Sequence, residues 1–577
     1  MLLAVHVLAA SAATTSLAEG QGPAPQPGVA PAGVSDLLAT GNVPLRAGEG
    51  AATATDTAAS RIVERMLGEI RRSEAEPRRL GLAEAVRLAV ENNPGIRGRA
   101  EIPRRDAYEP LAATGAFDPK FRVNATARSL RAPTGNALAS GFPVLDEEDV
   151  RTEVSISKLL RSGASVDVAW TSRILDTNSM FYMLNPAYDN RLGVTLRQPL
   201  LRNFWASEEN TTVLVARSEA EESLAAFEAD LSRFVSGVVD AYWEVVRATA
   251  ELEVTRRSVL LAREIVRDAD LKVKSGLLPE VAVKESLADA AAREERAIAA
   301  ENDLVVAGRD LQYQVMLGAL ENRAPEPVLP AEEHRVTPVE LDRAGSLATA
   351  LECRSEIRGA SYALGRRQLE EKRARNRRLP SLDLVARYNV FGLAGDVQPI
   401  RDLEGNIVLS PYGGDYGDSL GDMFSSDFNE YAVGLQLEVP LGNASARADL
   451  AQAGIEVRRA SRDLEQSVSS VALEVDRALA DVTSTAKRVT ASRSARELAE
   501  ENLRHQGERF QHGMVTTKDV LDYQERLESS QASEVRAITD HAQALTRLRV
   551  ADGTLLARFG LEIRSPEAPG EPWWYRF

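Results

Sequence analysis

The sequence predicts a mixed α/β fold that combines long antiparallel helical hairpins with amphipathic β-strands in two internal repeats. Three observations predict it: two helical runs of unusual length, several segments in which apolar and polar residues alternate, and an order of elements that occurs twice. Of the 577 residues, 27% are charged and 5% aromatic, which is typical of a helix-rich protein with a small aromatic core. The formal net charge of −16 argues against non-specific binding to nucleic acid.

Residues 1–18 are apolar and alanine-rich and end in Ser16-Leu17-Ala18, a small-residue pattern that signal peptidase accepts. We predict a cleaved export signal whose usual basic start is missing; a disordered apolar tail is the alternative. Residues 19–79, rich in Gly, Pro and Ala, are predicted to be a disordered linker. No later run of 18 uncharged apolar residues occurs, so no transmembrane helix is expected. A single cysteine, Cys353, allows neither an intrachain disulfide nor a cysteine-based metal site.

A helical pattern covers Leu82 to Leu111 and is interrupted at Asn93-Pro94. Beyond it the period changes to two, which indicates strands with one apolar and one polar face. Such segments suit a membrane β-barrel, apolar toward lipid and polar toward a wet lumen, although a half-buried strand of a soluble sandwich explains any one of them better when it is taken alone. The alternating segments are 121–128, 154–159, 164–171, 192–197, 382–390 and 431–439.

The first long helix is predicted from about Ser207 to Ser275. Its apolar positions are spaced three or four residues apart, and Gly237 is the only Gly or Pro between Asn210 and Gly276. At about 1.5 Å per residue this helix is roughly 100 Å long and needs partners along its whole length. Gly276 suits the left-handed residue after a helix and Pro279 suits the first turn of the next one, so residues 280–317 are predicted to return as an antiparallel partner.

The same unit occurs again in the second half. A helical run covers residues 446–511, breaks at Gly513 and returns over residues 516–559. In addition, residues 88–98 align with residues 349–359 without a gap. Each half is therefore predicted to contain a helix, strands, a long helix, a glycine break and a returning helix. We place the first repeat at 80–330, the second at 331–562 and a C-terminal tail at 563–577.

Three motifs give this pattern a specific resemblance: Phe117-Asp118-Pro119 before a strand, Gln198-Pro199-Leu200-Leu201-Arg202 after one, and Gly513 followed by Thr517-Lys518-Asp519-Val520-Leu521-Asp522. From about Leu82 to Gly560 the chain resembles the TolC-type outer membrane efflux family. The resemblance implies a homotrimer in which three chains complete one transmembrane β-barrel and one periplasmic α-barrel. Members of the family usually contribute two strands per repeat. An extra hairpin around 154–170 departs from that pattern, and the sequence leaves open whether it enlarges the barrel or lies outside it.

The function that the resemblance implies is a passive exit duct of a tripartite efflux or type I secretion system, without enzymatic activity or cofactor. Its implied partners are two further copies of the chain, outer membrane lipid, and a periplasmic adaptor that connects the duct to an inner-membrane pump. A structural coiled-coil spacer of the cell envelope is the alternative. Polar strand residues favour the duct because they are costly in a dry core. The predicted lumen-facing residues are Arg122, Asn124, Thr126, Asp383, Arg387, Asn389, Gln436 and Glu438.

The two glycine breaks lie as far from the strands as the helices allow, and their apolar neighbours are predicted to be exposed. Isolated exposed apolar residues are common, but paired tips repeated in a trimer favour a docking surface for the adaptor. The predicted tip residues are Gly276, Leu277, Leu278, Gly513, Met514 and Val515. Other candidate sites are weaker. His505 and His512 lie seven residues apart on one helix face, which is only a weak indication of a metal site, and the aspartate-rich segment 396–427 is interpreted as a solvated loop in preference to a calcium site.

Overall fold

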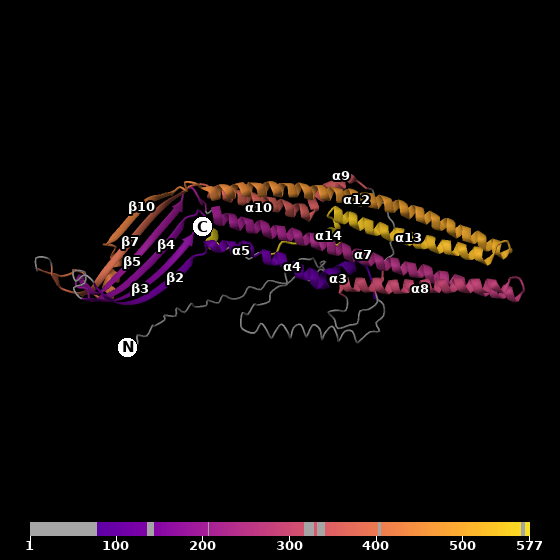
Figure 1. The fold of residues 1–577 in the computed structure, drawn as a ribbon, viewed down its shortest axis with the longest axis horizontal. Helices are drawn as coiled ribbons and strands as arrows, with labels where there is room; N and C mark the ends of the chain where they lie inside the picture. The colour runs from indigo at the N-terminus through magenta and orange to yellow at the C-terminus, as the bar shows by residue number, and fades with distance from the viewer. Residues whose placement is uncertain are drawn as a thin grey trace, which may run out of the picture.

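The computed structural model describes residues 78–134, 143–205, 207–316, 328–331, 341–401, 406–566, 570 and 572–576. The molecule is elongated, with a β-sheet at one end and long helices that run away from it (Figure 1). The predicted fold class is therefore confirmed. The predicted export signal and almost all of the predicted linker lie outside the described residues.

Four helices form two antiparallel hairpins of nearly equal size. They are α7 (Ser207–Lys274), α8 (Glu280–Val315), α12 (Ala444–Gln511) and α13 (Thr517–Ala551), with 68, 36, 68 and 35 residues. These matched lengths agree with an internal repeat. The predicted return over 516–559 is too long, because α13 ends at Ala551 and a separate turn, α14 (Leu555–Arg558), follows. Gly553, at φ 77°, separates the two, and a Cβ there would lie 3.0 Å from the Cβ of Cys353.

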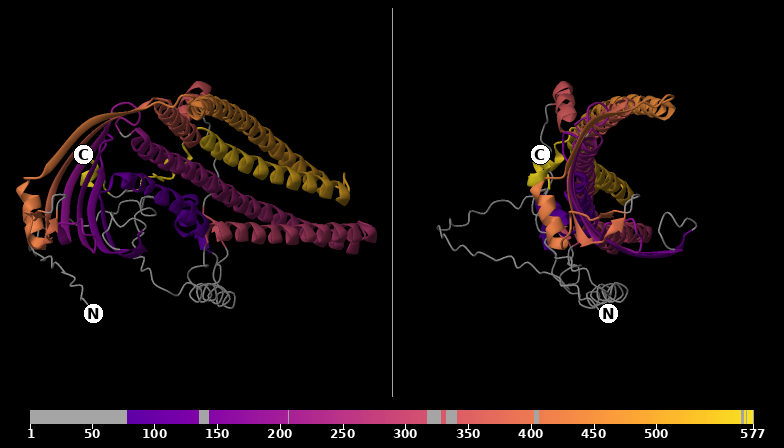
Figure 2. Two further views of the ribbon diagram at one scale, coloured as in Figure 1. Left: turned by 60° about the vertical axis from the view of Figure 1, so that its left-hand side comes forward. Right: turned by 90° about the vertical axis from the view of Figure 1, so that its left-hand side faces the viewer.

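Six strands form one antiparallel sheet in the order β10-β7-β5-β4-β3-β2. The extra hairpin of the first repeat, β3 and β4, lies inside this sheet, between β2 and β5. The sheet bends into an arc that the helices continue (Figure 2). The strands are β2 (Lys120–Pro133), β3 (Val144–Leu159), β4 (Ser165–Thr177), β5 (Leu184–Pro199), β7 (Ser381–Val397) and β10 (Asn429–Glu438).

The strand register sorts the sheet into one apolar and one polar face. Val123 lies opposite Val154, Val154 opposite Trp170, Trp170 opposite Leu192, and Leu192 opposite Val390, so one row of apolar residues crosses five strands. Directly opposite residues point to the same side of a sheet, and so do every second residues along a strand. Exposed members of this apolar face are Phe121, Val150, Ile156, Val168, Val194, Leu196, Tyr388, Tyr431, Val433, Leu435 and Leu437.

A short helix covers the far end of the apolar face. The aspartate-rich segment was predicted to be a solvated loop, and this is wrong for α11 (Tyr416–Ser425). Ser419 and Met423 of α11 are buried against β7, and the Asn190 amide donates to Ser419 Oγ at 2.7 Å. Gly392 makes the contact possible, since a Cβ there would lie 1.9 Å from the Ser419 carbonyl oxygen. The aspartates Asp415 and Asp418 cap the helix N-terminus rather than remain free.

Shorter elements pack around the long helices between the sheet and the middle of the molecule. They are β1 (Arg78–Leu80), α3 (Leu82–Asn92), α4 (Pro94–Asp106), α5 (Glu109–Thr114), β6 (Val328–Pro330), α9 (Arg343–Cys353) and α10 (Ser355–Arg377). The main apolar core joins α3, α7, α8 and α14, and a smaller one joins α9, α12 and α13. The predicted break at Asn93-Pro94 is confirmed, because the Asn93 side chain caps α4 by accepting from the Gly95 and Ile96 amides.

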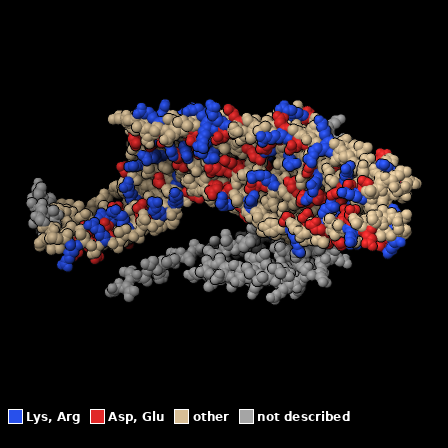
Figure 3. Space-filling model, turned by 45° about the vertical axis from the view of Figure 1, so that its right-hand side comes forward, with Lys and Arg blue, Asp and Glu red and all other residues tan. Residues whose placement is uncertain are grey.

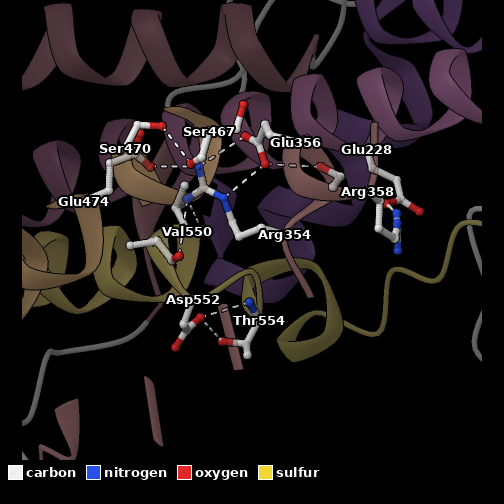
Figure 4. Close-up of polar contacts among 12 residues, drawn as sticks. Glu228, Arg354, Glu356, Arg358, Ser467, Ser470, Glu474, Val550, Asp552 and Thr554 are labelled. Atoms are coloured by element: carbon white, nitrogen blue, oxygen red, sulfur yellow. Dashed lines mark hydrogen bonds and ion pairs between the residues drawn. The ribbon is translucent and has the colours of Figure 1, made fainter. Parts of the chain in front are cut away.

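Equivalent residues of the two repeats hold the ends of the returning helices. Asn93 donates to the carbonyl of Gln314, near the end of α8. Arg354, which aligns with Asn93, donates to the carbonyls of Val550 and Ala551 at the end of α13, at 3.1 and 3.3 Å. It also contacts Glu474 of α12 (Figure 4). Free carbonyls at a helix C-terminus favour such donors, and favour a cation most.

The end of the described chain returns to the base of the sheet. The Trp574 indole donates to Asp118 at 2.8 Å, and the ring of Tyr575 lies 5.3 Å from that of Phe117. The Lys158 ammonium of β3 donates to the Trp574 carbonyl. The Phe117-Asp118 motif, which was noted because it precedes a strand, is therefore also the place where the C-terminal residues are held.

Candidate channel wall and helix tips

All eight residues predicted to face a lumen lie on the polar face of the sheet. In the register, Arg122, Asn124 and Thr126 of β2 lie opposite Ser155, Glu153 and Arg151 of β3. On the other side of the sheet, Gln436 lies opposite Asp383, Glu438 opposite Ser381, and Ala432 opposite Arg387. Asn389 lies opposite Glu430. The register thus brings the predicted residues together on one face; that this face lines a lumen stays a prediction.

Ion pairs and hydrogen bonds link the strands across this polar face. Arg197 of β5 lies 3.3 Å from Asp383 and donates to Gln436 at 2.7 Å, so it spans three strands. The Asn389 amide donates to Glu430 at 2.7 Å. A face with this density of charge suits contact with water and would be costly against lipid.

The inserted hairpin extends the polar face with charges that sequence reasoning missed. Arg173 of β4 makes two hydrogen bonds to Asp149 of β3, at 3.0 and 3.1 Å, and lies 3.7 Å from Glu147. The sequence signal was available, because Glu147, Asp149, Arg151 and Glu153 alternate along β3. Apolar residues are sparse on the other face in the first half of that strand, which weakens the pattern there.

The two helix tips have the same backbone geometry. Gly276 and Gly513 have φ values of 74° and 72°, in the left-handed region predicted for them. At the first tip, Gly276 N donates to the Val273 carbonyl and Leu277 N to the Lys272 carbonyl; at the second, Gly513 N donates to Phe510 and Met514 N to Arg509. This double hydrogen bond is the Schellman motif, which ends a helix with glycine in the left-handed conformation.

The apolar residues at the tips differ in exposure. Leu277 and Met514 are 73% and 67% exposed, as predicted, but Leu278 and Val515 are half-buried, so the prediction that all four face solvent is wrong for these two. They occupy the position before the N-cap of the returning helix, where an apolar side chain can pack back onto the following turn. The two tips lie side by side, because the Lys272 ammonium lies 3.7 Å from the centre of the Phe510 ring.

The second tip restarts its helix with a capping box. Thr516 Oγ1 accepts from the Asp519 amide, while the Asp519 carboxylate accepts from the Thr516 amide at 2.8 Å and from its hydroxyl at 2.7 Å. These hydrogen bonds from Thr516 hold the pKa of Asp519 below its ordinary value. At the first tip Pro279 occupies the N-cap and offers no side-chain acceptor. The second tip is thus the more firmly fixed of the two.

A buried polar cluster joins the two hairpins between the tips and the middle of the molecule. Arg293 of α8 is 1% exposed, and it donates to Asp289 at 2.7 Å, to Ser258 Oγ of α7 at 2.9 Å and to the Leu521 carbonyl of α13 at 3.3 Å. The Ser258 hydroxyl donates to Glu528 of α13 at 2.6 Å. Sequence reasoning missed this cluster, because an arginine in a charged helix resembles any solvated residue.

Further along the helices, burial changes the pKa of two groups. Burial raises the pKa of Asp240 on α7 and lowers the pKa of His541 on α13, since both groups lose hydration of the charged form. His541 Nδ1 lies 3.1 Å from Thr485 Oγ1 of α12.

Among the described residues, no group of three or more His, Cys, Asp or Glu side chains has the arrangement of a metal site. His505 contacts Glu501 and Glu508, at 3.6 and 3.8 Å. On the face that Figure 3 shows, lysines and arginines of the helical body are intermixed with acidic residues. Within the described part of the chain, no helix has both the length and the apolar character needed to span a bilayer.

A sheet with sorted faces, joined to paired helical hairpins that end in glycine turns, is the fold of the solved outer membrane channels that this structure matches. Residues 347–554 match the family model of outer membrane efflux proteins. Over these residues the chain is assigned to the TolC-type outer membrane efflux protein family, whose members are channels and not enzymes. It is accordingly an efflux channel protein of the outer membrane with a periplasmic extension.

Known proteins resemble this chain in sequence and in fold. The outer membrane protein TolC of Vibrio cholerae is 24% identical over 380 residues, which cover 65% of this chain and 78% of that protein. The structure of CusC matches with a TM-score of 0.56 at 15% identity, over 84% of this chain and 95% of that one. The open-state MtrE channel of Neisseria gonorrhoeae matches with a TM-score of 0.55 at 18% identity, over 85% and 95% of the two chains. At these identities the structures establish the fold alone.

Proposed function

We propose that three copies of this chain form one channel, with a β-barrel in the outer membrane and an α-barrel in the periplasm, and that this channel is the passive exit duct of a tripartite efflux or type I secretion system. One observation carries the proposal: the sheet has sorted faces but two open edges, β2 and β10. Unpaired backbone groups at a sheet edge are not viable in lipid, so the edges require partners.

The directions of the edge strands support closure by identical copies. β2 leads away from the helices and β10 leads back to them, and every neighbouring pair in the sheet is antiparallel. Pairing β2 of one copy with β10 of the next therefore continues the antiparallel pattern around a closed ring. A cyclic arrangement in which each copy uses both edges leaves none open.

The assembly is tested by mass photometry and chemical crosslinking of the protein in mild detergent, followed by single-channel recording in a lipid bilayer. We expect trimers and discrete conductance steps. Monomers alone would contradict the proposal. Trimers that never conduct, even after substitutions near the helix tips, would favour the structural spacer of the cell envelope instead.

We further propose that the tips bind a periplasmic adaptor and connect the channel through it to an inner-membrane pump. The exposed Leu277 and Met514 on paired, rigid turns support this interpretation. Gly513→Val forces a β-branched residue into the left-handed region, which costs about 1–2 kcal/mol and distorts the turn. Nothing lies within 4 Å of the Cβ position, so the change acts on the backbone alone.

The matched control is Gly507→Val, six residues earlier in α12, where the backbone is helical and the Cβ position is also free. We expect Gly513→Val to reduce export in cells at normal trimer level, and Gly507→Val to leave export unchanged. Normal export by the Gly513→Val variant at normal trimer level would refute the role of this tip.

A further inference from the structure

The inserted hairpin points to a wider barrel than the usual two strands per repeat would give. We propose that β3 and β4 are part of the transmembrane wall, so that the trimer closes a barrel of 18 strands whose bore is as wide as that of the helical part. The inference rests on the trimeric channel proposed above and concerns the size of cargo that the outer membrane part admits.

The hairpin carries the same two faces as its neighbours, in register with them. Val168 of β4 lies opposite Ile156 of β3 and Val194 of β5, and all three are exposed. On the other face, Arg173 pairs with Asp149. A hairpin outside the membrane would have no reason to continue an exposed apolar band across its own width, since such a band is costly in water.

The hairpin also has the length of a wall strand. β3 and β4 have 16 and 13 residues, against 14 for β2 and 16 for β5. The hairpin also connects β2 to the rest of the sheet, because β2 pairs with β3, while β5 pairs with β4 and β7. If the hairpin lay outside the sheet, β2 would not be joined to the other strands.

The width of the helical part fits six strands better than four. At about 4.8 Å between strands and a tilt of about 40°, each strand takes about 6.3 Å of circumference, so six take about 38 Å and four only about 25 Å. Beside the sheet, four helices, α5, α7, α10 and α12, lie next to one another. At 8–10 Å between axes they take roughly 32–40 Å, which matches six strands.

These widths set the bore. A barrel of 18 strands is about 36 Å across between backbones, and one of 12 strands about 24 Å. If side chains take about 5 Å on each side, half the spacing of packed sheets, the free widths are about 26 and about 14 Å. A ring of 12 helices leaves roughly 23 Å by the same reasoning. With the hairpin in the wall, the barrel does not select cargo by size, and solutes or polypeptides about 20 Å wide pass it.

The test removes the hairpin. Deleting residues 144–177 connects β2 to β5 at the ends that lie away from the helices. Pairing these two strands would place Val123 opposite Leu192, and both residues belong to the apolar face. The predicted product is therefore a trimer with a 12-stranded barrel. Full-length protein and deletion variant are recorded in a bilayer while uncharged polyethylene glycols are added on the extracellular side. Polymers of hydrodynamic diameter between about 15 and about 22 Å should lower the conductance of the full-length channel and leave the deletion variant unaffected.

Equal polymer cut-offs in two conducting trimers would overturn the 18-stranded wall and leave the proposed channel intact. Absence of trimers in the full-length protein would instead refute the proposed function. A second pair of variants serves if the deletion fails to fold. Val168→Arg places a charge on the apolar face and should abolish the membrane-inserted trimer, whereas Asp167→Arg, on the polar face, should preserve it. Equal trimer levels for these two variants would place the hairpin outside the membrane and overturn the inference.

Discussion

The buried Arg293 cluster makes a quantitative prediction about the join between the two hairpins. Arg293→Met keeps the apolar stem of the side chain but removes its three hydrogen bonds, to Asp289, Ser258 and the Leu521 carbonyl. Removing one partner of a buried ion pair typically costs 3–5 kcal/mol because it leaves the other charge uncompensated. In this cluster, the size of the penalty depends on the surroundings of Asp289 and Glu528.

Two features reduce the cost. The Asp289 side chain is 23% exposed and can be hydrated after the substitution. Glu528 keeps its hydrogen bond from the Ser258 hydroxyl, at 2.6 Å, and its ion pair with the Arg296 guanidinium, at 3.7 Å. We therefore expect a loss of about 2–3 kcal/mol, at or below the lower end of the usual range. Because the cluster joins α8 to α13, the loss should fall on local opening of these helices rather than on the sheet.

Hydrogen exchange measured by mass spectrometry on the trimer tests this expectation. Amides near Asp289 in α8 and Leu521 in α13 should exchange about 30- to 150-fold faster in Arg293→Met, since every 1.4 kcal/mol is tenfold. The control is Arg256→Met on the same hairpin, which removes an ion pair to Glu301 at 3.4 Å. Both side chains of this ion pair are more than half exposed, so Arg256→Met should speed exchange about fivefold or less. Equal exchange in the two variants would refute the assignment of Arg293 as a link between the hairpins.

Two further predictions concern α11 and His541. Gly392→Val places a Cβ 1.9 Å from the Ser419 carbonyl oxygen, so α11 should detach from the sheet and become sensitive to protease. The control Gly434→Val in β10, where nothing lies within 4 Å of the Cβ position, should leave the cleavage of α11 unchanged. Equal protection of α11 in both variants would contradict its packing. Burial lowers the pKa of His541 below 6.5, so just below that pH the unfolded chain binds more protons than the folded one. The stability that neutral His541 contributes is therefore complete above about pH 6.5 and is lost as the pH falls below it. Thermal denaturation at pH 7.5 and 5.5 should show a smaller difference in His541→Gln, and an unchanged difference would exclude this contribution.

Periodicity in the sequence was sufficient to predict the long helices and the faces of the strands. The seam along α7 and the glycine turns are local properties, and their chemistry leaves few alternatives. Which side of the sheet a strand residue faces also depends only on its position along the strand, which is why all eight predicted lumen residues lie on one face. Side-chain direction in a strand follows from sequence position alone.

Pairing across long separations was not predictable in the same way. The two repeats join into one sheet through the pairing of β5 with β7, about 200 residues apart, and no local pattern encodes that pairing. The packing of α11 was missed because an aspartate- and glycine-rich segment resembles a loop, and its burial depends on the absence of a side chain at Gly392. Arg293 was missed for a related reason, since its burial comes from the second hairpin and not from its own helix.

The two repeats differ where the fold constrains them least. Their long helices have equal length, as expected if both hairpins must reach the same level at the tips. Their insertions, the hairpin β3–β4 in one repeat and α11 in the other, both lie between the first and last strand of the repeat. A chain that leaves the helices through the first strand must return to them through the last, so strands can be added to the wall only in pairs. An added hairpin meets this condition and widens the barrel, whereas α11 leaves the strand number unchanged and covers the apolar face. The inserted elements thus leave the path of the chain into the long helices unchanged, and bore width and adaptor docking depend on different parts of the chain.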